Sequence, residues 1–231
     1  DVVLDPSYAT LQSNDVAVAT VYSPGRIQAL ANGSAIILVT SRGFQAATVI
    51  TVGMPQSGRA KQLYEIGLDT YPLAVSLSSL GGTRQFIVHP LGDIDLDPSQ
   101  QTNLGPAVSG TRYFINRPGV VTITADGLMT ALAPGTITVT VINGAAESVV
   151  PVLVEAPRTG QVTLGAAGGV VQGSDGSIVA VAPGTLPDGT PVSIAPLAEA
   201  ALPLSTPDGF TFAGAFELDI GDKTLDVPVQ L

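Results

Sequence analysis

Three aspartates at alternating positions, Asp93, Asp95 and Asp97, are the most chemically suggestive group in this 231-residue chain. The residues between them are apolar, which is the pattern of a strand. In a strand all three carboxylates would point to one face, about 6–7 Å apart. Oxygen ligands suit Ca²⁺, although Pro98 stands where an EF-hand loop needs its glycine. Two interpretations therefore stay open for this group, a solvated strand face and a weak Ca²⁺ site.

The remaining chemistry is sparse. A serine triad needs a histidine, and His89 is the only one, in a strand-like run that ends at Pro90. We expect it on the surface at a strand end. Without cysteine, the chain has no disulfide and no thiolate metal site. Since no phosphate-binding, dinucleotide-binding or nucleophile motif occurs either, we expect a non-enzyme with no catalytic residues, no cofactor and no assigned metal ligands.

A second acidic group surrounds a predicted C-terminal hairpin and consists of Glu217, Asp219, Asp222 and Asp226. Phe210 and Phe212 share a face nearby, and we expect them in the core. An intramolecular isopeptide crosslink is not expected, because it needs a buried lysine. The chain has only Lys61, in a predicted linker, and Lys223, in a predicted turn.

Composition excludes several classes of protein. The net charge is −10, charged residues make up 12% and apolar residues 45%, which argues against disorder and against binding of a nucleic acid backbone. The charge is −1 over residues 1–54, −3 over 55–157 and −6 over 158–231. No run predicts membrane insertion, because the longest uncharged one, 127–146, alternates Thr with Ile and Val. The chain begins at Asp1 without a leader pattern, which we interpret as a piece of a longer protein.

Short alternating runs closed by turns dominate the chain and predict an all-β fold. The strand-like runs are residues 73–77, 83–88, 121–124, 136–141, 177–181 and 216–220. The expected turns are Asn32-Gly33, Asp126-Gly127, Asn143-Gly144, Asp175-Gly176, Asp188-Gly189 and Asp208-Gly209. The best helical candidate, residues 60–66, is less than two turns long, so β-sandwiches are the expected architecture.

An internal repeat indicates more than one domain. Ala29-Leu30-Ala31 recurs as Ala131-Leu132-Ala133, and Gly25 recurs as Gly127, an offset of 102 residues. Residues 1–7 resemble 93–99 at an offset of 92, so the second copy carries about 10 extra residues. Only the second copy has strand-like sequence ahead of this match. We therefore predict that the first copy lacks its first strand or strands and exposes a sheet edge.

These motifs resemble the bacterial immunoglobulin-like group 2 (BIG2) family, through a glycine, an Ala-Leu-Ala and a second glycine ahead of alternating Ile, Val and Thr. Residues 13–21 fit the family's preceding stretch well and residues 116–123 fit it loosely. Residues 168–194, with Pro183-Gly184-Thr185-Leu186 and then Gly189-Thr190, resemble a ZU5-type β-sandwich. The predicted modules are 1–54, a BIG2-like domain lacking its first strands; 55–157, a linker and complete BIG2-like domain; and 158–231, a ZU5-like sandwich. Linkers are expected near 53–60 and 155–160.

The resemblance implies tandem Ig-like sandwiches in an elongated rod, in an extracellular or cell-surface bacterial protein. Three functions follow from it. The chain is a structural or adhesive module of a surface protein, or a filament or sheath subunit whose neighbours complete the open first domain, or a carbohydrate-binding accessory region of a secreted enzyme. The expected partners are protein, either self or neighbouring domains, with a glycan as a further alternative, and neither nucleic acid binding nor membrane insertion is expected.

Overall fold

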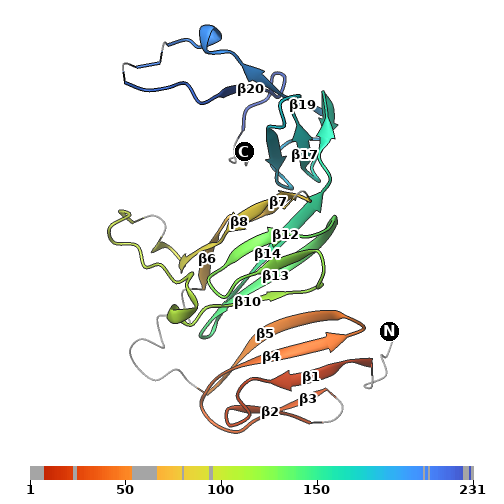
Figure 1. Ribbon diagram of the computed structural model, residues 1–231. Coiled ribbons are helices and arrows are strands. Elements are labelled where there is room, and N and C mark those ends of the chain that lie inside the picture. Colours follow the sequence, from red (N-terminus) through yellow and green to blue (C-terminus); the bar gives the residue numbers. More distant parts are fainter. Residues whose placement is uncertain are drawn as a thin grey trace. The chain divides into compact units, whose positions relative to one another are not determined.

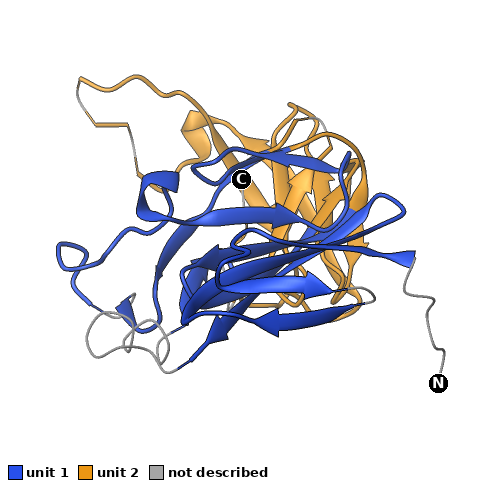
Figure 2. Ribbon diagram, turned by 90° about the horizontal axis from the view of Figure 1, so that it is seen from below, with its two compact units in different colours: residues 1–73, 83–130, 136–152 blue, residues 74–82, 131–135, 153–231 orange. Residues whose placement is uncertain are grey.

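A computed structural model describes residues 8–22, 25–53, 67–79, 81–93, 96–204, 206–207, 209–225 and 229. Their regular structure is β-strand apart from short 3₁₀ helices such as η3 (Ala107–Ser109) and η4 (Glu199–Ala201), which confirms the all-β prediction (Figure 1). No helix within these residues is long and apolar enough to cross a membrane. The chain divides into two compact units, residues 1–73, 83–130, 136–152 and residues 74–82, 131–135, 153–231 (Figure 2).

The first repeat, residues 8–53, forms two antiparallel sheets, β1-β4-β5 and β2-β3. Its strands are β1 (Thr10–Ser13), β2 (Ala19–Tyr22), β3 (Arg26–Ala29), β4 (Gly33–Ser41) and β5 (Phe44–Val52). Nine residue pairs join β4 to β5. Arg42 and Gly43 close this hairpin with φ angles of 49° and 82°, the double positive φ of a type I′ turn, whose twist suits the flanking strands.

The second repeat, residues 67–155, has the sheet orders β10-β13-β14-β7, β11-β12-β8 and β6-β9. Its strands are β6 (Leu68–Tyr71), β7 (Val75–Ser78), β8 (Thr83–Gln85), β9 (Ile87–Pro90), β10 (Arg112–Ile115), β11 (Val121–Ile123), β12 (Leu128–Ala131), β13 (Gly135–Asn143) and β14 (Ala146–Glu155). Asp126-Gly127 lies between β11 and β12, as the sequence predicts, and Gly127 has φ 82°. The predicted Asn143-Gly144 turn is shifted by one residue, because Asn143 ends β13 and Gly144 with Ala145 forms the turn.

Strand positions repeat along the chain at the predicted offset. Strands β1 to β5 begin 102 residues before β10 to β14, in the same order. The pairing register repeats with them: Thr10 faces Thr40 in the first repeat, and Arg112 faces Ile142 in the second. The five strands are therefore two copies of one structural unit.

The two repeats differ in the size of their core residues. Phe86, Met129 and Ile137 are at most 1% exposed in the second repeat. In the first repeat Ile37 is also 1% exposed, but the clustered core residues are the smaller Val18, Ala19 and Ala35, with partly buried Val52. Since buried apolar area is the main stabilising contribution, the second repeat has the stronger core.

The third segment, residues 158–225, places two three-stranded sheets around one apolar cluster. The sheet orders are β15-β17-β18, in which β15 and β17 are parallel, and β16-β19-β20. The strands are β15 (Arg158–Thr159), β16 (Val162–Leu164), β17 (Gly169–Gln172), β18 (Ile178–Val181), β19 (Thr190–Leu197) and β20 (Ala215–Asp219). Buried members of the cluster include Leu164, Val171, Val179 and Val192. The segment is a β-sandwich, and its ZU5-like identity stays a prediction.

Three local predictions need correction. The expected strand 83–88 is broken at Phe86, whose ring is 1% exposed and whose amide donates to the carbonyl of Gly127, so β8 and β9 join different sheets. Phe210 is 75% exposed and is not a core residue. The expected strand at 73–77 begins only at Val75. The helical candidate at 60–66 lies outside the described residues, as does most of the first linker.

Candidate functional site

A strand edge in the first repeat that no other described strand covers is the main candidate site, and comparison with the second repeat defines it. There β12 pairs with β8, with Met129 opposite Arg84. The equivalent strand of the first repeat is β3, which has β2 as its sole strand neighbour among the described residues. The far edge of β3 thus corresponds to the edge that β8 covers in the second repeat.

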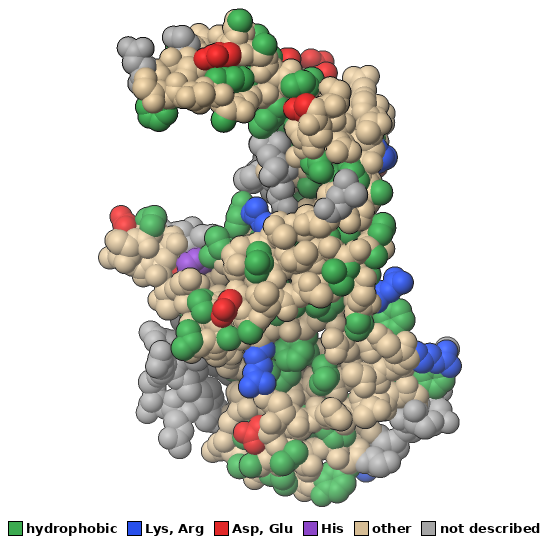
Figure 3. Space-filling view, in the orientation of Figure 1, with side chains coloured by type: hydrophobic (Ala, Val, Ile, Leu, Met, Phe, Trp, Pro, Cys, Tyr) green, Lys and Arg blue, Asp and Glu red, His purple; other side chains and the backbone are tan. Residues whose placement is uncertain are grey.

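Side-chain exposure follows this difference position by position. Met129 is fully buried and Ala131 is 4% exposed. Their equivalents 102 residues earlier are Ile27, which is 39% exposed, and Ala29, which is also exposed. Every residue of β3 is exposed, and Leu30, directly after it, is 54% exposed. Hydrophobic side chains are visible at the surface of the first repeat in Figure 3.

The far edge of β5 is also without a strand partner among the described residues, but the second repeat covers it. The carboxylate of Glu147 accepts hydrogen bonds from the amide of Val49 and the hydroxyl of Thr48, both at 3.0 Å. The amide of Gln45 donates to the carbonyl of Asn116 at 2.8 Å. These bonds satisfy outward backbone groups of β5, as a neighbouring strand would.

Side chains extend the same joint. Gln45 Nε2 donates to the carbonyl of Ile115 at 2.6 Å. The guanidinium of Arg117 lies 6.0 Å from the ring centroid of Phe44, within the range of a cation–π contact. The joint therefore links the turn end of the β4–β5 hairpin to the end of β10. Among the described residues, β3 is then the edge that has a strand cover in the second repeat and none in the first.

Strand β20 is a second exposed edge, in the third segment. Its one strand neighbour in the described part of the chain is β19, with Ile194 opposite Leu218. Leu218 packs against the apolar cluster, whereas Phe216 is 42% exposed and the acidic Glu217 and Asp219 are exposed. The strand thus alternates an apolar face with an acidic one.

The aspartate group at 93–97 does not form the strand that the sequence predicts. Asp93 lies in a 3₁₀ turn and Asp97 in a loop, and Asp95 lies outside the described residues. The Asp93 carboxylate accepts from the amide of Thr102 at 2.7 Å. Asp97 accepts from both the amide and the hydroxyl of Ser99, and these hydrogen bonds lower the pKa of Asp97 below its ordinary value. Both carboxylates therefore stabilise the loop, and no cluster that could hold a metal ion occurs in the described residues.

His89 is buried, contrary to expectation, at 6% exposure. Its Nδ1 donates to the carbonyl of Thr102 at 2.8 Å. Because one ring nitrogen is already engaged with backbone, His89 anchors the loop after β9 to that strand. The sequence missed this role because the partner carbonyl is 13 residues away.

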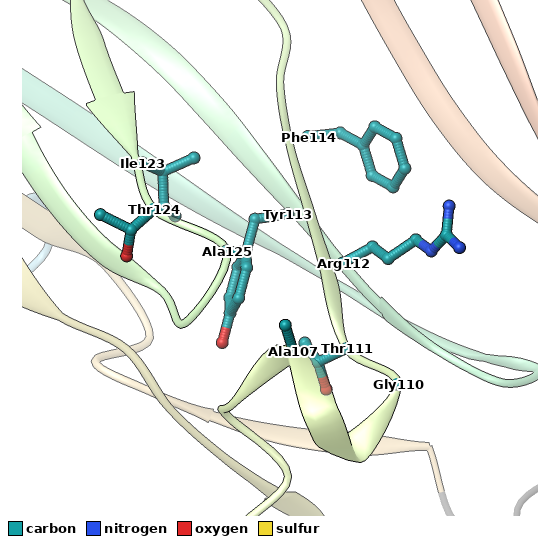
Figure 4. A pocket seen from close by; sticks show the side chains of 9 residues that line it. All are labelled: Ala107, Gly110, Thr111, Arg112, Tyr113, Phe114, Ile123, Thr124 and Ala125. Atoms are coloured by element: carbon teal, nitrogen blue, oxygen red, sulfur yellow. The ribbon is translucent and has the colours of Figure 1, made fainter.

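A hollow of about 490 Å³ lies beside Tyr113 and Phe114 on β10 (Figure 4). Burial, with a smaller contribution from the charge of Asp126, raises the pKa of Tyr113 to about 12. Its hydroxyl donates to the carbonyl of Gly105 at 2.8 Å. Tyr113 is therefore a neutral structural anchor, and the residues that line this hollow include no carboxylate and no histidine.

Comparison with known proteins places one segment in a family. Residues 95–154, about a quarter of the chain, match the family model of the bacterial Ig-like domain (group 2). The match covers β10 to β13 and most of β14. The assignment of the first repeat and of the third segment to families stays a prediction. No curated protein matches this sequence.

Several solved structures resemble the chain at low identity. The S-layer protein SbsC domains 4 and 5 are 20% identical over 65% of this chain and 72% of that one, with a TM-score of 0.28. The SbsC domains 1–6 are 18% identical over 97% of this chain and 32% of that one, with a TM-score of 0.32. Human protocadherin-24 EC1-2 is 10% identical over 64% and 82%, with a TM-score of 0.24. The chain thus spans about a third of the longer SbsC structure, and these similarities assign it neither function nor partner.

Proposed function

We propose that this chain is a non-catalytic structural and adhesive module of a bacterial surface protein, located at the cell surface or outside the cell. The bacterial Ig-like match at residues 95–154 supports this role. The modules in this proposal are residues 1–54, 55–157 and 158–231. The sparse chemistry of the described residues agrees with it, since their carboxylates and their histidine mainly hold loops.

The observation that carries the proposal is the repeated sandwich with its hydrogen-bonded joint. Backbone groups of β5 bind Asn116 and Glu147 of the next repeat, so the two copies are coupled through main-chain atoms. A spacer or stalk needs this kind of junction, because it must keep its modules in register while it projects a surface from the cell.

Antibody labelling tests the location. Antibodies raised against the second repeat should label intact, unpermeabilised cells of the source bacterium, and cells that lack the gene provide the control. A cytoplasmic protein labelled in parallel reports on leakage. Labelling that requires permeabilisation would contradict the proposal. For the adhesive part, the cells that lack the gene should attach less to a surface, and the restored gene should recover attachment.

A second function, a subunit of an extracellular filament or sheath, is favoured by the exposed face of β3. An inter-subunit strand would cover Ile27, as its equivalent Met129 is covered within its own repeat. Electron microscopy of the native material should then show ordered polymers with strand pairing between subunits. A chain that stays monomeric at high concentration would count against this function.

A further inference from the structure

The uncovered edge of β3 has the geometry of a strand acceptor. The second repeat supplies the template, because β8 runs antiparallel beside the equivalent strand β12. Exposed, unpaired strand edges favour pairing with another chain. Glu147 and Asn116 occupy the β5 edge, whereas the edge of β3 that corresponds to the β8 side of β12 has no strand beside it in the described part of the chain.

The same chain carries a strand that fits this acceptor. Strand β20 has five residues, β3 has four, and each is an edge strand in the described part of the chain. Phe216 on β20 is 42% exposed and Ile27 on β3 is 39% exposed. Each apolar side chain lacks cover at an edge where a neighbouring strand would provide it.

We propose that β20 of one copy pairs antiparallel with β3 of a second copy, so that the sheet β16-β19-β20 continues into the sheet β2-β3. This inference rests on the proposed structural role and adds its assembly contact. The apolar faces would then be continuous, with Phe216 and Leu218 beside Ile27 and Ala29. On the opposite face, Glu217 and Asp219 would lie beside Arg26.

Charge selects this pairing over its alternatives. Opposite charges on neighbouring strands stabilise a sheet and like charges destabilise it. Pairing of β20 with β20 would bring together Glu217 and Asp219 of both copies, and pairing of β3 with β3 would bring together two Arg26 side chains. The pairing of β20 with β3 joins unlike charges instead. Because the two surfaces differ, an assembly of any length keeps one free acceptor at one end and one free donor at the other, which gives head-to-tail association.

The test measures the mass of the whole 231-residue chain by light scattering and sedimentation over a range of concentrations and at low and high salt. The unmodified chain should increase in mean mass beyond a dimer as its concentration rises, and less so at high salt. Arg26→Glu should weaken association about tenfold or more, because it replaces attraction with repulsion. Arg112→Glu, an equal charge change at the one exposed residue of β10, is the matched control and should associate like the unmodified chain.

A mixing experiment identifies the two surfaces. The acceptor variant Arg26→Glu and the donor variant Glu217→Lys/Asp219→Lys should each stay monomeric alone. Mixed in equal amounts at low salt, they should associate into oligomers in which the two variants alternate, because the two unmodified surfaces fit each other and the two charge-reversed surfaces also attract each other. The three substitutions combined in one chain should restore association. Circular dichroism and thermal melting of every variant check that it is folded.

Three results would overturn the inference. The first is an unmodified chain that stays monomeric at every concentration, and the second is one that stops at a dimer. The third is a mixture of folded variants that does not associate. Surface labelling of cells is independent of all three, so failure of this contact and failure of the proposed location are distinguishable.

Discussion

Truncating one core position in each repeat gives a matched test of the incomplete first sandwich. Met129 and Ile27 lie 102 residues apart at equivalent places on β12 and β3. Met129 is fully buried, whereas Ile27 is 39% exposed. We expect Met129→Ala to destabilise its repeat clearly more than Ile27→Ala destabilises the first.

The magnitudes follow from the atoms removed. Each substitution deletes three side-chain heavy atoms, which at about 0.8 kcal/mol per buried methylene gives about 2.4 kcal/mol for complete burial. Met129→Ala also leaves a cavity, so its cost should be about 3 kcal/mol or more. Ile27 is only about three-fifths buried and opens to solvent, so its loss should be about 1.5 kcal/mol with no cavity contribution.

Hydrogen exchange with mass spectrometry is the suitable assay, because a chain with several modules does not unfold in two states. Peptides covering residues 121–131 and 19–29 report the free energy of local opening in each repeat. The measurement belongs at concentrations where the chain is monomeric. An Ile27→Ala loss equal to or larger than the Met129→Ala loss would refute the reasoning, since it would mean that Ile27 is covered within the monomer.

Three further predictions concern the joint, Tyr113 and the third segment. Glu147→Ala removes the acceptor of the Val49 amide and should speed amide hydrogen exchange over β5 about fivefold, corresponding to about 1 kcal/mol. Glu147→Gln keeps an acceptor oxygen and should restore part of the protection from exchange. The pKa of Tyr113 is raised to about 12, so its contribution to stability is complete below its unfolded pKa near 10 and is lost as pH rises from there to about 12. In urea unfolding, the Tyr113→Phe variant should therefore lose less stability than the unmodified chain between these two pH values. An equal loss would contradict the reasoning. Gly168→Ala places a Cβ at φ +74° against the carbonyl of Val181, whereas the Cβ of Gly176→Ala, at φ +88°, meets nothing within 4 Å. By thermal melting, Gly176→Ala should cost about 1–2 kcal/mol of stability and Gly168→Ala at least about 1 kcal/mol more. Equal losses of stability would contradict the clash at Gly168.

Much of the strand content could be predicted, because short β-branched runs with period two leave few alternatives. The run 136–141 lies within β13, and 177–181 and 216–220 overlap β18 and β20. The failures share a physical cause. The run 83–88 alternates well, but Phe86 turns into the core and splits it, and the aspartates at 93–97 alternate equally well but cap a loop. Periodicity cannot separate these cases, since the decisive partners are distant in sequence.

The candidate site was also only partly predictable from the sequence. The missing strands of the first copy follow from the repeat alignment, because only the second copy has strand-like sequence ahead of its match. Which edge stays open does not follow from it. The cover on β5 comes from Glu147, about 100 residues downstream, and an exposed glutamate at that position carries no signal of its own in the sequence.

The amino-acid sequence alone determined the all-β class, the spacing of 102 residues and the scarcity of catalytic groups, because these depend on residue types and local periodicity. Tertiary structure decided that His89 is buried, that Phe210 is exposed and that β3 lacks the cover its equivalent β12 receives from β8. Burial is a property of what packs against a residue, and for a strand edge that neighbour can come from anywhere in the chain.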